Sequence, residues 1–329
     1  MRLIFAGSPA FAVPSLERLL AGRHEVVAVV TQPARPAGRG LVLTDPPVKV
    51  AALRHGLEVH QPEIFNSSKF LDMLESLRPD LIVTAAYGRI FKSRALGLPR
   101  RGCVNLHASL LPKYRGVAPI NWAIISGEAE TGVTTFFMEE GVDTGDLILS
   151  RTTAILPDET AGELTDRLAG LGAEVLAETC DLVESAKVPR VKQDQSLASY
   201  APKLAKGDGR VAWDQDAQAV HNRIRGVNPW PGAFCQFRGQ PLKLLSSRLP
   251  DDRAGVWGPT MAGGGSGSRE PAVAGGHGLV IGIDSRDGIL VSCSSGSVWL
   301  RMLQAQGKKP TSSADFARGY RIKIGDSFG

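Results

Sequence analysis

The chain has 329 residues, 43% of them hydrophobic, and a formal net charge of +5 at pH 7. This length predicts two domains because it exceeds one ordinary hydrophobic core, and the hydrophobic fraction argues against a disordered or fibrous chain. No apolar run approaches the roughly 20 residues of a membrane-spanning helix, and the first residues lack the features of a signal peptide, so we expect a cytoplasmic protein without membrane association.

The chain begins with an alternation of apolar runs and helical patterns. A strand is predicted at 2–6, a helix over 10–21 from the spacing of its apolar residues, and a second strand at 26–30. The run Asp45-Pro46-Pro47 then opens another helix. This order is typical of a βαβ unit, and it predicts an α/β fold with a parallel sheet.

The same alternation continues through strands at 80–83 and 103–106 and ends in a long amphipathic helix over 161–186. We therefore predict a Rossmann-like domain over 1–188. Its first turn reads A-G-S-P-A-F instead of G-x-G-x-x-G, and no acidic residue ends the second strand. Both departures disfavour a nicotinamide dinucleotide site.

The sequence changes in character after a predicted linker at 189–209. Short alternating runs separated by glycines follow, at 233–237, 242–245, 279–283, 289–292 and 298–303, with one helix over 217–225. They predict a small antiparallel β-barrel domain over 210–329. The glycine- and serine-rich stretch 262–278 is predicted to be a loop between two barrel strands.

The positive charge is concentrated in the second part of the chain. Residues 1–190 carry 20 Lys and Arg against 22 Asp and Glu, whereas residues 191–329 carry 18 against 11. A basic module beside a near-neutral one is typical of a protein with a polyanionic partner. From the charge distribution alone, ordinary solubility explains the excess of Lys and Arg as well as a polyanionic partner does.

Three polar residues point to chemistry at the end of a strand. Asn105 and His107 are two residues apart, so they lie on one face at the carboxyl end of a predicted parallel strand, where ligands of open α/β sheets bind. Asp143 lies in a glycine-flanked turn after the next strand and can reach the same crevice. An amide that stabilises an oxyanion and an imidazole tuned by a carboxylate suit acyl transfer to an amine.

The cysteines and the remaining histidines suggest no metal. Cys103, Cys180, Cys235 and Cys293 form no C-x-x-C pair, which favours reduced thiols. The histidines outside the predicted site show no metal-ligand spacing.

The sequence resembles the folate-dependent formyltransferases. The signature is N-L-H-A-S-L-L-P-K-Y-R-G at 105–116 followed by G-V-D-T-G-D-L-I at 141–148. Matches continue along nearly the whole chain, including F-A-G-S-P at 5–9, Y-A-P-K-L at 200–204 and G-K-K-P at 307–310. The loop P-A-R-P-A-G-R-G at 33–40 and the run N-P-W-P at 228–231 favour the branch that acts on methionyl-tRNA.

The resemblance implies roles for individual residues. Asn105, His107 and Asp143 match the catalytic triad of the family. The residues that match its tetrahydrofolate site are Ser109, Leu110, Leu111 and Pro112, together with Ala86, Tyr87 and Gly88 of its pterin pocket. Structural explanations stay open for several of these, since Leu110, Leu111 and Tyr87 also suit core packing and Pro112 suits a turn.

The resemblance also implies an activity and partners. The enzyme would transfer the formyl group of 10-formyltetrahydrofolate, without a metal, to the α-amino group of methionyl initiator tRNA. Arg39 and Arg35 would contact the tRNA from a Pro/Gly-rich loop, in which Leu41 and Val42 stand where relatives often carry lysines. The C-terminal barrel would be OB-like and would bind tRNA. We expect a monomeric, bacterial-type enzyme.

Two alternatives remain at this stage. A formyltransferase of the same fold could act on an amino-sugar nucleotide or another small amine such as glycinamide ribonucleotide. A tRNA-binding module with an inert catalytic domain is a second alternative, and the intact Asn105, His107 and Asp143 argue against it.

Overall fold

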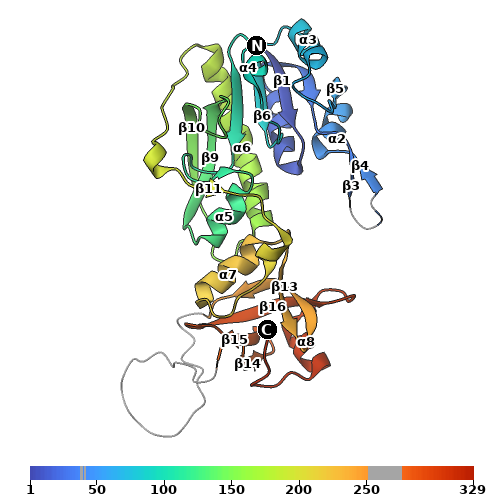
Figure 1. The fold of residues 1–329 in the computed structure, drawn as a ribbon, viewed down its shortest axis with the longest axis vertical. Helices are drawn as coiled ribbons and strands as arrows, with labels where there is room; N and C mark the ends of the chain where they lie inside the picture. Colours follow the sequence, from blue (N-terminus) through green and yellow to red (C-terminus); the bar gives the residue numbers. More distant parts are fainter. Residues whose placement is uncertain (38–39, 41, 251–275) are drawn as a thin grey trace. The chain divides into compact units, whose positions relative to one another are not determined.

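The computed structural model describes residues 1–37, 40, 42–250 and 276–329 (Figure 1). Arg39, Leu41 and most of the predicted 262–278 loop therefore lie outside the described residues. The chain forms two compact units. The first contains 1–120, 130–154 and 163–203, and the second contains 121–129, 155–162 and 204–329.

The first unit is built on a seven-stranded sheet with the order β10-β9-β7-β6-β1-β2-β5. The strands up to residue 203 are β1 (Arg2–Gly7), β2 (Glu25–Val30), β3 (Arg35–Ala37), β4 (Val42–Thr44), β5 (Val59–His60), β6 (Leu81–Ala85), β7 (Cys103–His107), β8 (Arg115–Gly116), β9 (Glu130–Phe137), β10 (Leu147–Ala154) and β11 (Tyr200–Ala201). The helices are η1 (Ala10–Ala12), α1 (Val13–Leu20), α2 (Pro47–Arg54), α3 (Ser68–Ser76), α4 (Ser93–Leu96), α5 (Pro119–Ile125), α6 (Ala161–Glu184) and η2 (Gln195–Leu197).

The parallel part of the sheet confirms the predicted α/β fold class. The strands β5, β2, β1, β6 and β7 pair in parallel, whereas β9 and β10 add an antiparallel edge beside β7. Every strand and helix that the sequence predicts before residue 188 is present, with ends that differ by a few residues. The predicted helix over 10–21 begins as the short helix η1 before it continues as α1.

The two faces of β7 have different neighbours. Cys103 belongs to a buried cluster with Leu71 of α3 and Ala95 of α4. Leu106 points to the opposite face, where a Cβ atom at Gly172 of α6 would lie 2.7 Å from its Cδ2. Gly172 therefore lets the long helix approach β7 closely, which fixes the strand that carries the predicted site.

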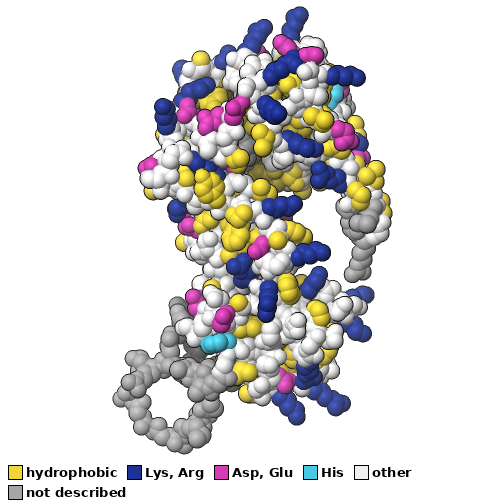
Figure 2. All heavy atoms as spheres, viewed as in Figure 1, with side chains coloured by type: hydrophobic (Ala, Val, Ile, Leu, Met, Phe, Trp, Pro, Cys, Tyr) yellow, Lys and Arg dark blue, Asp and Glu magenta, His cyan; other side chains and the backbone are white. Residues whose placement is uncertain are grey.

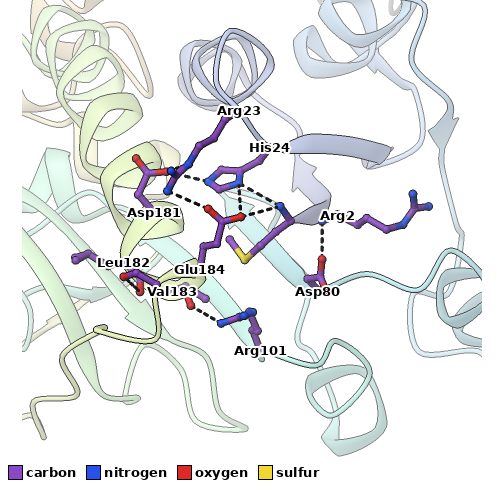
Figure 3. A network of polar contacts seen from close by, with 11 residues as sticks. Arg2, Arg23, His24, Asp80, Arg101, Asp181, Leu182, Val183 and Glu184 are labelled. Atoms are coloured by element: carbon purple, nitrogen blue, oxygen red, sulfur yellow. Dashed lines mark hydrogen bonds and ion pairs between the residues drawn. The ribbon is translucent and has the colours of Figure 1, made fainter.

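A polar network joins the end of α6 to the neighbouring parts of the first unit (Figure 3). Asp181 and Glu184 of α6 form ion pairs of 2.9 Å with Arg23, and His24 lies 3.1 Å from Asp181. Arg101 donates a 2.6 Å hydrogen bond to the carbonyl of Val183. These contacts hold the carboxyl end of α6 against the segments that flank β2 and β7.

Most of the residues predicted to form a linker belong to the first unit. In β11, Tyr200 and Ala201 pair in parallel with Arg115 and Gly116 of β8. Val191 forms an antiparallel bridge to Leu147 at the start of β10. The stretch 191–203 is therefore part of the folded first unit, which its sequence does not reveal because its strands are only two residues long.

The second unit is a sheet with the order β12-β13-β16-β15-β14, to which β17 adds beside β16. Its strands are β12 (Ala233–Phe237), β13 (Gln240–Arg248), β14 (Val280–Asp284), β15 (Gly288–Ser292), β16 (Ser297–Ala305) and β17 (Thr311–Ser312), and its helices are η3 (Lys206–Gly209), α7 (Ala217–Gly226) and α8 (Ser313–Tyr320). All five predicted strands and the predicted helix are present. The five central strands pair antiparallel, as predicted.

The last residues connect the two edges of this sheet. Phe328 bridges to Phe237 of β12, and Ser327 bridges to Leu279 beside β14. The backbone amide and carbonyl of Gly329 each form a 2.7 Å hydrogen bond with Gln236. Edge strands are thereby paired, which gives the sheet the closed character of a small barrel.

Segments from the first half of the chain pack into the second unit around α7. Asn121 donates to the carbonyl of Gly226 at 2.7 Å. Arg225, which is 6% exposed, donates to the carbonyls of Leu156 and Glu159 at 3.1 and 3.2 Å. The second unit thus contains more of the chain than the residues beyond the predicted linker.

No helix among the described residues is both long enough and apolar enough to cross a membrane.

Candidate active site

Asn105 and His107 lie on the face of β7 that also carries Cys103, at the carboxyl end of the strand. Thr84 of the neighbouring strand β6 is paired with Asn105 in register. Its hydroxyl donates a 2.6 Å hydrogen bond to Asn105 Oδ1. Because the oxygen of the amide is engaged, the NH₂ group of Asn105 is the part that it can offer to a ligand.

His107 is 6% exposed and is held by a backbone carbonyl. Its Nε2 lies 2.9 Å from the carbonyl oxygen of Tyr114, so Nε2 carries a hydrogen and donates it. Its Nδ1 faces Asp143 Oδ2 at 3.6 Å. That contact is attractive when a proton lies between the two atoms, on Nδ1 or on the carboxyl group.

Asp143 reaches this position from the turn between β9 and β10. Its backbone has φ +54°, in the left-handed region, which Asp tolerates better than most residues. Its side chain is 15% exposed, and Oδ2 accepts a 2.8 Å hydrogen bond from the backbone amide of Gly116. The structure therefore brings Asp143 and His107 together, as the sequence predicted.

The S-L-L-P stretch turns directly after β7. The hydroxyl of Ser109, which is fully buried, donates to the carbonyl of Lys113 at 2.6 Å. Leu111 is 6% exposed, whereas Leu110 and Pro112 are half-buried. Ser109 thus stabilises its own turn, and the predicted folate contact of the stretch stays a prediction.

Ala86, Tyr87 and Gly88 follow the carboxyl end of β6. Ala86 and Gly88 are exposed and have φ +48° and φ +73°. Tyr87 is 4% exposed and packs against Phe65 and Phe91, and burial raises the pKa of its phenol to about 12. The side chain of Tyr87 belongs to the hydrophobic core. A pterin contact at this position would therefore involve the exposed backbone of Ala86 and Gly88 on either side of it.

The Pro/Gly-rich loop is partly a hairpin. Residues of β3 pair antiparallel with β4, with Arg35 opposite Thr44 and Pro36 opposite Leu43. Arg35 is exposed, and the side chains of Val42 and Leu43 are 65% and 68% exposed. Val42, one of the two positions where relatives often carry lysines, therefore presents an apolar side chain to solvent, and the predicted contacts of Arg35 and Arg39 with tRNA stay predictions.

The remaining reactive groups give no second catalytic site among the described residues. All four cysteines are buried and free, and burial raises the pKa of Cys103, Cys180 and Cys235 to about 12. The described residues contain one cluster with metal-ligand spacing, which is His24, Asp181 and Glu184. Both of its carboxylates already pair with Arg23 (Figure 3).

The arrangement suits transfer of an acyl group to an amine. The Asn105 NH₂ group can donate to an oxyanion, and His107 with Asp143 can hold a proton. Neither Ser109, whose hydroxyl bonds within its own turn, nor Cys103, which is buried at the start of β7, is placed as a nucleophile.

Two family models match the chain. The model described as formyl transferase covers residues 1–180, and the model described as formyl transferase, C-terminal domain, covers residues 203–321. The chain belongs to the formyl transferase family. The family that the motifs predicted is therefore confirmed.

Curated relatives resemble this formyl transferase over its full length. Proteins named methionyl-tRNA formyltransferase from Geotalea uraniireducens and Geobacter sulfurreducens are 45% and 46% identical to it over 329 residues. These alignments cover 100% of this chain and 98% and 97% of the two relatives.

Solved structures share the fold at low sequence identity. WlaRD, a sugar 3N-formyl transferase, has a TM-score of 0.64 at 18% identity, with 94% of this chain and 99% of that chain covered. HypX from Aquifex aeolicus in complex with tetrahydrofolic acid has a TM-score of 0.63 at 18% identity, and the match covers 99% of this chain and 48% of that one. At this low identity, the two similarities show only that this formyl transferase shares the fold of those proteins.

Two contacts of the site were missed in the sequence. The partner of His107 is a backbone carbonyl, at Tyr114, and backbone atoms leave no trace in residue types. The Thr84 hydroxyl could have been found, because Thr84 is a polar residue within the apolar run of a predicted buried strand. Such a residue needs a hydrogen-bond partner, which is here Asn105.

Proposed function

We propose that this formyl transferase transfers the formyl group of 10-formyltetrahydrofolate to the α-amino group of methionyl initiator tRNA, giving N-formylmethionyl-tRNA for translation initiation. The observation that carries the proposal is the identity of 45–46% over the whole chain to relatives named for that reaction. The contact of His107 with Asp143 supports it, since two of the three residues proposed to act in catalysis lie within 3.6 Å of each other.

In the proposed reaction, the amine nitrogen bonds to the formyl carbon, the bond from that carbon to N10 breaks, and one proton passes from the amine side to N10. The Asn105 NH₂ group donates to the formyl oxygen as negative charge develops there. His107 and Asp143 hold the proton that is moved. No covalent bond to the protein is required.

We further propose where the two substrates bind. The folate would lie beside Ser109–Pro112 and Ala86–Gly88, whose backbones leave β7 and β6 at the same edge of the sheet. The tRNA would contact Arg35 and Arg39 and a basic C-terminal domain over 210–329. The enzyme would act as a monomer in the cytoplasm, without a metal.

An acceptor assay tests this proposal directly. The protein is supplied with 10-formyltetrahydrofolate and, in parallel reactions, with methionyl initiator tRNA, the uncharged tRNA, glycinamide ribonucleotide and a nucleotide-linked amino sugar. We expect formylation of the charged tRNA alone. Preferred formylation of either small amine would overturn the proposed acceptor while leaving the family assignment intact.

Asp143→Asn tests the proposed proton-holding pair. Asn tolerates the left-handed backbone and keeps an acceptor for the Gly116 amide, so the turn should survive. The loss of the negative charge should lower kcat by about 10²-fold or more, the usual contribution of acid–base catalysis. Asp146→Asn makes the same change three residues away and should leave kcat unchanged. A D143N enzyme as fast as the D146N enzyme would contradict the mechanism.

A further inference from the structure

Arg115 is the largest fully buried side chain of the described residues, at 1% exposure. Its guanidinium donates to amide oxygens from the stretch after α6: Nε and Nη2 to Gln193 Oε1 at 3.1 and 2.6 Å, and Nη1 to Gln195 Oε1 at 2.8 Å. A buried cation is costly unless its donors are satisfied. The two glutamines therefore fold the stretch back onto β8.

The other end of the Gln193 amide contacts the turn that carries Asp143. Its Nε2 donates to the backbone carbonyls of Asp143 and Gly145 at 2.9 and 2.8 Å. Gln193 is 8% exposed, so these are enclosed hydrogen bonds. Because its oxygen faces a donor and its nitrogen faces two acceptors, the amide has one satisfactory orientation.

The strand that contains Arg115 holds the same turn from a second side. The backbone amide of Gly116 donates to Asp143 Oδ2 at 2.8 Å. β8 is itself held by pairing with β11, which follows Gln193 in the chain. Both the backbone and the carboxylate of Asp143 are therefore fixed by β8 and by the stretch 191–201.

The turn needs such support because of its backbone. Asp143 has φ +54°, a conformation that is less stable than the right-handed one for residues other than glycine. Hydrogen bonds to the carbonyls of the turn stabilise the observed conformation against relaxation. Relaxation would move the carboxylate away from Nδ1 of His107, which lies 3.6 Å away.

We propose that Gln193, oriented by Arg115, is a positioning residue that holds Asp143 at the distance from His107 that catalysis requires. This inference rests on the proposed function, because it assumes that Asp143 acts in formyl transfer. Through Gln193, the stretch 191–201, which lies in the predicted linker, takes part in the chemistry of the first unit.

Gln193→Glu keeps the acceptor function of the side-chain amide and removes its donor function. A carboxylate still accepts from Arg115 and pairs with its charge, so the variant should fold. It cannot donate to the carbonyls of Asp143 and Gly145, so the turn is released. We expect kcat to fall by about 10- to 100-fold, as for other small misplacements of catalytic groups, with the KM for the folate unchanged.

Gln195→Glu is the matched control. It adds the same charge beside the same guanidinium, but the Gln195 side chain donates only to the carbonyl of Gln193, at 3.5 Å, and not to the turn. We expect wild-type kcat in this variant. Gln193→Met adds no charge but removes both the donors to the turn and the acceptor of Arg115, so it should be at least as slow as Gln193→Glu. Equal rates of the Q193E and Q195E enzymes would overturn the proposal.

A double variant shows whether Gln193 acts through Asp143. If it does, Gln193→Glu should have no further effect on kcat in an Asp143→Asn enzyme. A further loss of the same factor in that enzyme would overturn the proposal. A slow D143N enzyme with a fast Q193E enzyme would overturn the inference alone, whereas a fast D143N enzyme would overturn the proposed mechanism together with it.

Discussion

Thr84 and Asn105 form a pair across two neighbouring strands, and the chemistry of the amide depends on it. An amide side chain can present either its oxygen or its NH₂ group to the same space. The 2.6 Å hydrogen bond from the Thr84 hydroxyl selects the orientation in which the NH₂ group is available for an oxyanion. Thr84 is 2% exposed, so water cannot replace this contact without entering the core.

Thr84→Val should therefore slow the enzyme through its effect on Asn105. Valine has nearly the same shape and favours strands, so the fold should be kept. We expect kcat to fall by less than the about 10²- to 10³-fold that loss of a complete oxyanion donor causes. Thr84→Ser keeps the hydroxyl and should retain most of the rate. Steady-state kinetics of the two variants checks this, and equal rates for both would show that the hydroxyl does not orient Asn105.

At the residue scale, sequence reasoning was successful where side chains alternate along one strand. The spacing of Asn105 and His107 was sufficient to place them on one face, and the glycine-flanked Asp143 was correctly brought to His107. The partners Thr84 and Tyr114 depend on the register between strands and on backbone atoms. The residue types do not report the backbone carbonyl of Tyr114. The polar Thr84 within an apolar run does indicate a hydrogen bond, but it does not say that Asn105 is the partner.

At the scale of elements, strongly periodic segments were predicted well and two-residue strands were not. The long helix α6 and the five barrel strands have repeats that a sequence shows directly. β8 and β11 contain two residues each, and β3 includes a proline that lacks a donor. Their pairing is determined by the surrounding fold, which explains why a linker was predicted over 189–209 and a loop over 33–40.

The helix α7 contains a buried histidine whose protonation should affect stability. His221 is 1% exposed, its Nε2 lies 2.9 Å from the carbonyl oxygen of Pro157, and its Nδ1 lies 2.9 Å from the Ser247 hydroxyl. Burial is the main cause that lowers the pKa of its imidazole, although the bond to Pro157 opposes this effect. The unfolded chain, with the ordinary histidine pKa of about 6.5, then binds the proton more readily than the folded chain.

The second unit should therefore lose stability as the pH falls below about 6.5, where the unfolded state gains the proton, and should keep its full stability above that value. His221→Gln should reduce the fall in urea midpoint between pH 8 and pH 5.5. Tryptophan fluorescence is a suitable probe, because every described tryptophan belongs to the second unit. His277→Gln, at an exposed position of the same unit, is the control. An equal fall in the urea midpoint of the H221Q and H277Q proteins would contradict the assignment of the pH effect to His221.

At the scale of the whole molecule, the division into units does not follow the order of the chain. The segments 121–129 and 155–162 belong to the second unit, and 191–203 belongs to the first. Composition and charge change near residue 190, but packing is decided by long-range contacts that composition does not report. The predicted domain limits at 188 and 210 therefore stay a prediction, and a truncated protein would cut through contacts of both units.

Basic residues are spread over the second unit, and its visible face carries more Lys and Arg than Asp and Glu (Figure 2). Lys308 and Lys309 are exposed and line a hollow that also contains Phe316 and Tyr320. The rings of these two residues stack with centroids 4.2 Å apart. Phe316 is buried and Tyr320 is 39% exposed, so the cations lie beside one exposed ring. Cations beside an exposed ring are among the groups that contact phosphates and bases in nucleic-acid sites.

If the second unit contributes to tRNA binding through these charges, substituting Lys308→Gln and Lys309→Gln together should weaken the affinity for methionyl-tRNA and reduce its dependence on salt. The slope of log affinity against log salt should become shallower by about two, one for each phosphate that is no longer neutralised. Lys69→Gln with Lys92→Gln removes the same charge from exposed positions of the first unit and is the matched control. We expect a smaller change in slope for this control. The measurement is the affinity of both double variants for methionyl-tRNA across a series of salt concentrations. Equal slopes for the two double variants would show that the effect is one of net charge, and that these lysines of the second unit do not form part of the tRNA site.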